Sequence, residues 1–431
     1  MIRGRRVLFA SVFLILLLVP VLRLYERAPQ MTVSDYTTYW LAADYIAQHP
    51  NVGIYSAQGE KAMHAYIHKR HGQLVFQEDF ENTQTPFLYA TVHCTSTGNL
   101  PNDFLRHQAA AMVVFGIALW YFFVQARLPV LGRILLVLYV LYVYPPFQSE
   151  FANANVNRWL LGTMAFGHWL GRRRQRYASF CSWVVWGLAV SFKPIVALAP
   201  ALILGAHGLA GQRKRLRAEG AGLFCGGILA FLAGCLFFRD WSCWLSWLSR
   251  VKGLPLSASP LEHFNFSLPI LVAAGLDMAI PTFILGMAIA IACLTVLRIW
   301  FRDPSRRVCD CPPQVTLPAG DSEFLLAALG LLIYLLWAPL VWFHYHMLSL
   351  PLIVILFRRN MCQWPIHGIG SALLASLTLV TMVLVSSMPI LLLHSALNVL
   401  LIVGGLMWLG AALLFTLGLI ELHRASNSPA R

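Results

Sequence analysis

The chain has 431 residues, of which 58% are hydrophobic and only 12% are charged. Because average soluble domains carry roughly 25% charged residues, this composition excludes an ordinary soluble enzyme and predicts an all-α protein with many transmembrane helices. The formal net charge of +14 does not indicate nucleic-acid binding, since the arginines stand in short clusters between apolar runs instead of forming one basic face.

The nine cysteines are scattered along the chain, and several lie inside apolar runs, where cysteine is usually a small buried hydrophobe. Cys309 and Cys311 are the only close pair, and no second pair completes a zinc spacing. We therefore expect no disulfide framework, no metal and no other cofactor.

The first apolar run, residues 7–24, follows Arg3, Arg5 and Arg6 and has no small-residue cleavage site after it. This favours an uncleaved signal anchor, the first span, over a signal peptide. The polar region that follows, residues 25–107, is far longer than ordinary connections. We predict that it forms one long loop on the extracytoplasmic side.

The residues after Asp35 predict a helix in which Tyr39 and Trp40 share one face while Asp44 leans to the other. An aromatic-faced helix beside a span suits the membrane interface, where amphipathic rings settle. Asp35 would stand in the first turn, which leaves two interpretations open: a carboxylate that only caps the helix, or a general base. Residues 60–71 predict a second short amphipathic helix.

Eleven further apolar runs predict transmembrane segments, about twelve in total, within one domain that covers residues 1–431. Several are shorter than the ~20 residues that cross a bilayer upright, so we expect flanking polar residues to lie within the membrane as well. The runs are approximately 108–124, 130–147, 156–170, 177–192, 194–209, 220–238, 268–297 (with a break expected at Pro281), 324–337, 347–357, 368–387 and 390–419.

Basic residues predict which ends of these segments are cytoplasmic, because lysine and arginine accumulate in cytoplasmic loops. With the N-terminus inside, arginine clusters fall inside at every turn, including residues 172–176, residues 213–217 and the predicted cytoplasmic loop 298–322. Both termini would then be cytoplasmic. Asp35 would lie on the outer face of a bacterial cytoplasmic (inner) membrane.

Lys193 and Pro194 interrupt what would otherwise be one apolar stretch over residues 178–209. A lysine between two spans can extend its ammonium to the membrane interface without any further role. It can also hold the phosphate of a lipid-linked substrate, since lysine is a compact charge. The residues leave both interpretations open.

Three asparagines, Asn153, Asn155 and Asn157, precede a span together with Arg158. One asparagine can cap a helix, but a cap does not account for three. We therefore predict a polar pocket at the head of this span.

His344 and His346 stand with Trp342 and Tyr345 between two spans. An aromatic belt at the interface accounts for Trp342 and Tyr345, but less well for the histidines. No carboxylate or cysteine is near enough in sequence to complete a metal site. We expect both histidines to donate hydrogen bonds to phosphate or sugar oxygens.

The pattern Asp35-x-x-x-Tyr39-x-x-Ala42-Ala43, followed by Gly53-x-Tyr55, resembles the first-loop motif of polyprenol-phosphate-mannose-dependent mannosyltransferases. These are multispanning enzymes of the GT-C class, glycosyltransferase family 87. Further similarities follow in the family's order over roughly residues 7–351: Pro86 to Ala90, Asn157, Gly187 to Lys193, Asn265-x-Ser267 and Trp342-x-His344.

The resemblance implies a GT-C-type enzyme that transfers a hexose, mannose in the family, from a polyprenyl-phosphate donor to a cell-envelope glycan or glycolipid. Its partners would be this donor, this acceptor and the lipid bilayer. In a single inverting displacement, Asp35 would take the proton of the acceptor hydroxyl as general base. The residues expected at the donor's phosphate or sugar are Lys193, His344, His346, Asn157, Asn265 and Arg158. Those expected to line the acceptor pocket are Tyr39, Asp44, Asn155 and Trp342.

Other functions fit parts of the pattern. A flippase or transporter of lipid-linked saccharides would share the spans and the polar residues within them, but the chain has no convincing internal repeat of the kind that transporters often show. An O-antigen-type polymerase or ligase also acts outside on lipid-linked sugars, usually with its large polar loop late in the chain. A non-catalytic partner of cell-envelope synthesis also stays open.

Overall fold

The computed structural model describes residues 34–50, 53–71, 83–173, 177–253, 265–301, 319–362, 369–385 and 397–427. The predicted first span lies outside these ranges, as do Cys309, Cys311 and residues 302–318 of the predicted cytoplasmic loop. The all-α class is confirmed, because the described residues form helices and their sole β element is one isolated bridge between Asn265 and Trp342.

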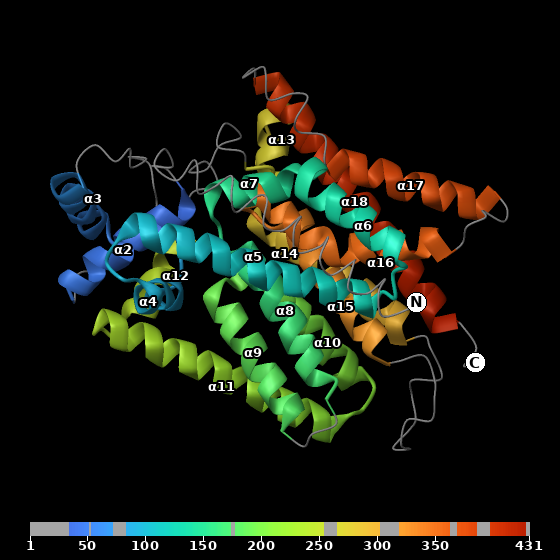
Figure 1. Cartoon of the computed structure of the whole chain (residues 1–431), viewed down its shortest axis with the longest axis horizontal. Helices are drawn as coiled ribbons and strands as arrows, with labels where there is room; N and C mark the ends of the chain where they lie inside the picture. The colour runs from blue at the N-terminus through green and yellow to red at the C-terminus, as the bar shows by residue number, and fades with distance from the viewer. Residues whose placement is uncertain are drawn as a thin grey trace.

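The helices follow one another from α2 to α18, and Figure 1 shows their arrangement. In the first half of the chain they are α2 (Asp35–Gln48), α3 (Ala57–His71), α4 (Pro86–Thr95), α5 (Leu100–Gln125), α6 (Val130–Leu138), η2 (Tyr139–Val143), α7 (Pro145–Asn153), α8 (Asn157–Gly171) and α9 (Ala178–Phe192). In the second half they are η3 (Pro194–Val196), α10 (Leu198–Leu209), α11 (Arg213–Phe238), α12 (Cys243–Gly253), α13 (Leu268–Leu276), α14 (Thr282–Phe301), α15 (Ala319–Trp337), η7 (Phe343–Ser349), α16 (Leu350–Cys362), α17 (Ile369–Val385) and α18 (Leu397–Asn427).

Four of these helices, α5, α11, α14 and α18, are long and apolar enough to cross a membrane. The pair α6–α7, bent by 57° after η2, makes a fifth if it is counted as one span. The bend has a covalent cause, because Pro145 and Pro146 begin α7 and lack the backbone donors that would continue the helix. Helix α11 exposes large apolar side chains such as Phe224 and Leu236, as a lipid-facing helix does. The total of about twelve spans stays a prediction.

The predicted long loop, residues 25–107, is folded into helices rather than extended: α2, α3, α4 and the first turns of α5 lie within it. Helices are present at both predicted positions, as α2 and α3, while their place at a membrane interface stays a prediction. These elements pack with α12 and the end of α11 around a shared apolar core that includes Tyr39 and Met63. We call α2, α3 and α4 together the α2–α4 layer, which lies at the left of Figure 1.

Asp103, at the start of α5, fixes α2 in this layer. Its buried carboxylate accepts hydrogen bonds from Trp40 Nε1 at 3.0 Å, Ser96 Oγ at 2.8 Å and Thr97 N at 2.8 Å. Because a carboxylate this well bonded is held in one place, the middle of α2, where Trp40 lies, has a defined position against α5.

Helices α9 and α11 approach each other closely because glycines face across their crossing. A Cβ on Gly187 would lie 2.2 Å from the Leu223 carbonyl oxygen, and one on Gly226 would lie 2.2 Å from that of Val184. Small residues allow such close packing between membrane helices. The C-terminal end of α9, where Lys193 follows, is thereby held in place.

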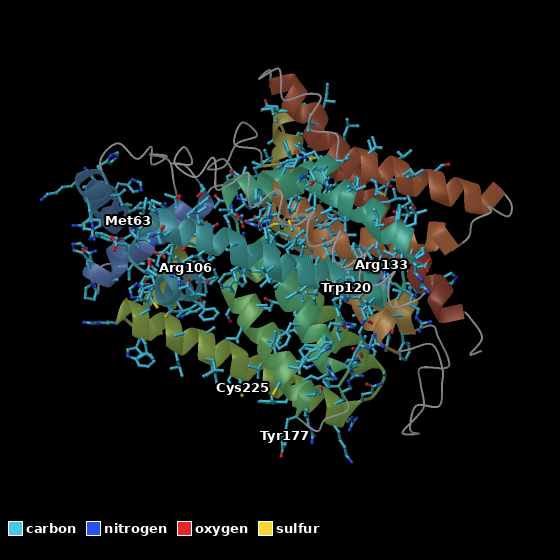
Figure 2. All side chains as sticks on the ribbon, in the orientation of Figure 1. Met63, Arg106, Trp120, Arg133, Tyr177 and Cys225 are labelled. Carbon is cyan, nitrogen blue, oxygen red and sulfur yellow. The ribbon has the colours of Figure 1, made fainter. Side chains whose placement is uncertain are left out.

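The α2–α4 layer and the basic connections lie at opposite ends of the molecule. Helix α8 runs away from the layer to Arg172 and Arg173, and Arg133 packs its guanidinium 5.6 Å over the Trp120 ring near the same far end. Figure 2 shows Arg133 and Trp120 close together, far from Met63 of α3. This separation agrees with the loop-charge pattern, while the side of the membrane on which each end lies stays a prediction.

Candidate active site

Polar side chains from separate elements meet where the α2–α4 layer joins the bundle. We call them the Asn155 cluster: Asp35 and Tyr39 of α2, Asn155 of the α7–α8 turn, Lys193 at the end of α9 and His344 of η7. The sequence predicts each of these residues as part of a site, and the fold brings all five together. All except Asp35 are buried.

A tight turn between α7 and α8 presents Asn155. Ala154 ends α7 with a left-handed φ of 51°, and the Asn155 N–H donates to the Glu150 carbonyl oxygen at 3.2 Å. The Glu150 carboxylate then takes the place of a helix cap for α8, accepting from Asn157 N at 2.9 Å and from Asn157 Nδ2 at 2.8 Å. The backbone of Asn155 is therefore fixed on both sides.

The contacts of Asn155 decide which way its amide points. Its Oδ1 accepts from Lys193 Nζ at 2.8 Å and from Val156 N at 2.6 Å. Both partners are donors only, so this atom must be the oxygen. The amide nitrogen therefore faces Asp35 Oδ2 at 2.5 Å and His344 Nε2 at 2.9 Å.

This orientation also sets the tautomer of His344. Since Asn155 Nδ2 is a donor, His344 Nε2 must accept and carries no proton, so the ring proton of a neutral His344 sits on Nδ1. Nε2 is therefore an acceptor here, and the expected donation from His344 to phosphate or sugar oxygens, which would come from Nδ1, stays a prediction. Nε2 lies 3.9 Å from Asp35 Oδ2, so two basic atoms lie side by side at the Asn155 amide nitrogen.

Asp35 is not the cap of α2. That role belongs to Ser34, whose side chain accepts from Thr37 N at 3.1 Å, so the capping interpretation of Asp35 is wrong. Burial raises the pKa of Asp35 above its usual range, and the hydrogen bond from Asn155 and the charge of Lys193 partly offset this rise. Although protein surrounds the carboxylate, 32% of the side-chain surface remains exposed, so part of Asp35 is accessible to solvent.

Lys193 does not extend to the membrane interface. The residue is only 4% exposed, and its ammonium points into the cluster, 2.8 Å from Asn155 Oδ1 and 4.4 Å from the centre of the Tyr345 ring. The snorkelling interpretation is therefore wrong. A buried ammonium held by a neutral amide and an aromatic face keeps its charge available to a ligand.

Asn157 and Arg158 lie behind the cluster rather than in it. Both are fully buried, and Arg158 pairs with Glu150 at 3.8 Å and donates to Gln108 on α5. Most of their contacts lie within the α5–α7–α8 junction, which is a scaffold for the α7–α8 turn, and Asn157 Nδ2 also donates to the His344 carbonyl oxygen at 3.4 Å. A donor-binding role for these two residues stays a prediction.

Asn265 and Trp342 form the β-bridge that leads into η7. Asn265 Oδ1 accepts from Val341 N at 3.0 Å and from Ser267 N at 3.1 Å, so it positions the segment before His344. His346 is 1% exposed, and neither of its ring nitrogens has a hydrogen-bond partner among the described residues. Direct contact of these residues with donor or acceptor stays a prediction.

Asp44 lies outside the Asn155 cluster, near the other end of α2. It accepts from Gln48 at 2.9 Å and from the Tyr66 hydroxyl at 3.1 Å, and it pairs with Arg70 of α3 at 3.4 Å. The prediction that it lines the same pocket as Tyr39 is not supported by these contacts, because they join α2 to α3.

The sequence interpretation missed Glu150 as part of the site's support. Its signal was an acidic residue within a predominantly apolar region, which usually marks a paired or functional group. Its actual task, capping α8 from four residues before the turn, depends on the left-handed backbone at Ala154. The sequence does not indicate that conformation, because the residue is an alanine and not a glycine.

Within the described ranges, no three His, Cys, Asp or Glu side chains gather so that they could hold a metal ion. In the cluster, Asp35 and His344 would supply two ligands at most, and Asn155 lies between them.

The fold and this cluster define a helical membrane protein with a polar site built at helix ends. Residues 99–311, just under half of the chain, match the model of glycosyltransferase family 87. The match indicates a glycosyltransferase. No curated protein and no solved structure matches the chain. The match covers the Asn155 turn and Lys193, whereas Asp35, Tyr39 and His344 lie outside it.

Proposed function

We propose that this glycosyltransferase moves a hexose, with mannose as the first candidate, from a polyprenyl-phosphate donor to a hydroxyl of a cell-envelope glycan or glycolipid. The reaction would take place on the extracytoplasmic face of a bacterial inner membrane. One observation carries the proposal: a carboxylate, Asp35, and an ammonium, Lys193, are held on opposite sides of a single amide, Asn155.

This pair suits the charge changes of a single displacement. The acceptor oxygen attacks the anomeric carbon and gives its proton to Asp35, while the bond from that carbon to the phosphate oxygen breaks and its electron pair stays on the phosphate. Because one bond forms as another breaks on the opposite face, the anomeric configuration inverts. His344 Nε2, 3.9 Å from Asp35 Oδ2, presents a second acceptor for the same proton.

Lys193 would stabilise the leaving phosphate. Its burial favours this role, since a charge removed from bulk water acts more strongly on a neighbouring anion. The other buried cation described nearby, Arg158, is paired with Glu150, which leaves one ammonium directed into the cluster. One cation suits a phosphate monoester leaving group better than a diphosphate, which supports a polyprenyl-phosphate sugar over a sugar nucleotide.

The test is turnover of a polyprenyl-phosphate hexose by the purified protein in detergent or nanodiscs, with release of polyprenyl phosphate and formation of glycosylated acceptor as readouts. Asp35→Asn removes the base but retains size and hydrogen bonding, so we expect turnover to fall by about 10²–10⁴-fold. Asp44→Asn on the same helix is the matched control and should retain wild-type turnover.

Undiminished turnover in Asp35→Asn would remove Asp35 as the base. Movement of the intact donor across vesicles without bond cleavage would instead support a flippase, and the glycosyltransferase proposal for this donor would then fail.

A further inference from the structure

The amide nitrogen of Asn155 has more acceptors around it than hydrogens to give. It carries two hydrogens, yet it lies 2.5 Å from Asp35 Oδ2, 2.9 Å from His344 Nε2 and 3.4 Å from Tyr39 Oη. Because three acceptors share two hydrogens, a small change in the position of the amide redistributes its hydrogen bonds.

Lys193 anchors this amide from the opposite side. Asn155 Oδ1 holds two donors, Lys193 Nζ at 2.8 Å and Val156 N at 2.6 Å. Within the described ranges, the hydrogen bond of the Lys193 ammonium is the one to Asn155 Oδ1. An ionised phosphate is a stronger acceptor for an ammonium than a neutral amide oxygen, so a phosphate at Lys193 would compete for one of the two anchors.

The backbone cannot absorb this change, because the α7–α8 turn is fixed. Glu150 accepts the Asn155 N–H through its carbonyl oxygen and holds the first turn of α8 through its carboxylate. Both Glu150 and the turn residue Ala154 are fully buried. Any adjustment therefore falls on the Asn155 side chain.

We propose that Asn155 couples the donor phosphate to Asp35: when the phosphate takes the Lys193 ammonium, the amide loses one of its two anchors and its hydrogen bond to Asp35 weakens. This inference rests on the proposed function, because it assigns the donor's phosphate to Lys193. A carboxylate that loses a hydrogen-bond donor becomes a stronger base. Asp35 thus gains basicity when the donor is in place. Asn155 is a positioning residue, and no bond forms or breaks at it.

Other groups also set the proton affinity of Asp35, so the test must isolate the amide. The charged and titratable groups around the cluster are Lys193 at the end of α9, His344 and Tyr345 in η7, Tyr39 in α2 and Glu150 in α7. Substitution of Asn155 leaves all of these groups in the protein, and the donor's phosphodiester stays ionised throughout. A change in the pH profile then reports the amide.

The experiment compares the acid limbs of two pH profiles in the full-length protein, those of kcat/KM and kcat, and single-turnover reactions check that kcat reports the chemical step. The limb of kcat/KM reports Asp35 in the free enzyme, and the limb of kcat reports it in the donor complex. In Asn155→Ala we expect the kcat/KM limb to move up by about one pH unit, as one hydrogen bond to a carboxylate is lost. The kcat limb should stay where the wild type has it, because the donor has already weakened that bond.

The matched control is Asn153→Ala, because the Asn153 amide bonds to Ser149 Oγ at 3.3 Å instead of entering the cluster. Both of its limbs should coincide with those of the wild type. If the alanine variant does not fold, Asn155→Ser, which keeps an oxygen for the Val156 N–H, carries the same test.

Equal movement of both limbs would show that Asn155 holds Asp35 statically, and no movement would show that it does not act on Asp35; either result overturns the coupling. A wild-type protein that does not cleave the donor at all would contradict the proposed function instead.

Discussion

Two of the clusters that bury charge among the described residues are arranged in opposite ways. In the His207 cluster, formed by His207 of α10, Arg215 and Glu219 of α11 and Glu323 of α15, the charges close on one another. Glu219 accepts from His207 Nδ1 at 2.7 Å and Arg215 Nε at 2.8 Å, and Glu323 accepts from His207 Nε2 at 3.1 Å and Arg215 Nη2 at 2.6 Å. Because both His207 nitrogens face carboxylates, both carry protons, and two positive charges balance two negative ones.

In the Asn155 cluster the charges are kept apart. Asp35 and Lys193 each bond to the same neutral amide, and Asp35 keeps 32% of its side-chain surface exposed. A closed set of charges binds helices together, whereas charges that are held apart, one of them partly exposed, are available to a ligand. The comparison predicts that substitutions in the His207 cluster reduce stability, and that substitutions in the Asn155 cluster reduce activity.

After Asp35→Asn, the largest expected effect is that of Lys193→Met. Methionine fills similar volume without charge, so the leaving phosphate loses its cation, and we expect the rate of donor cleavage to fall by about 10²–10³-fold. The thermal unfolding temperature in detergent should change little, since the variant also removes the cost of burying an ammonium. Lys252→Met, at an exposed position of α12, serves as the control for both measurements.

A second prediction concerns Glu219→Gln in the His207 cluster. Glu219 is fully buried, and glutamine in its place carries no charge and offers one acceptor oxygen where His207 and Arg215 each bond to a carboxylate oxygen. We expect the free energy of unfolding to fall by roughly 2–3 kcal/mol, less than for a wholly buried pair because Arg215 is partly exposed. Turnover per folded molecule should match the wild type. A large loss of turnover at full stability would break the comparison between the two clusters.

The helices of the first polar region could be predicted from the sequence because their information is local. The aromatic face of α2 and the amphipathic pattern of α3 are set by neighbours three and four residues apart. The role of Asp35 could not be separated from capping in this way, since Ser34 and Asp35 are both good caps. The backbone chooses between them: Ser34 takes the extended conformation of a cap, and Asp35 is already helical.

The Asn155 cluster could be predicted as a set of residues, but not as an arrangement. Asn155 and His344 are 189 positions apart, and their contact depends on how η7 packs against the α7–α8 turn. Likewise, the sequence leaves Lys193 undecided between interface and site. The close α9–α11 packing at Gly187 and Gly226 decides the matter, because it holds the end of α9 inside the protein.

A third, smaller prediction follows from the raised pKa of Asp35. Folding favours the protonated acid, so the stabilisation due to protonated Asp35 is present below the unfolded pKa and is lost as pH rises through the folded pKa. Asp35→Asn does not ionise. Its unfolding temperature should equal that of the wild type near pH 4 and exceed it by about 2 °C at pH 8. If the difference in unfolding temperature did not depend on pH, ionisation of Asp35 would not destabilise the fold.

The smallest effect is expected for Asp44→Asn, which tests whether one helix carries two kinds of carboxylate. Asp44 pairs with Arg70 at 3.4 Å, and the Arg70 side chain is 45% exposed, so solvent screens the pair and its loss should change the free energy of unfolding by less than about 0.5 kcal/mol. Turnover should also be unchanged, because Asp44 contacts α3 and not the Asn155 cluster. If Asp44→Asn reduced turnover as strongly as Asp35→Asn, the site would have to extend along α2, beyond the five residues that now define it.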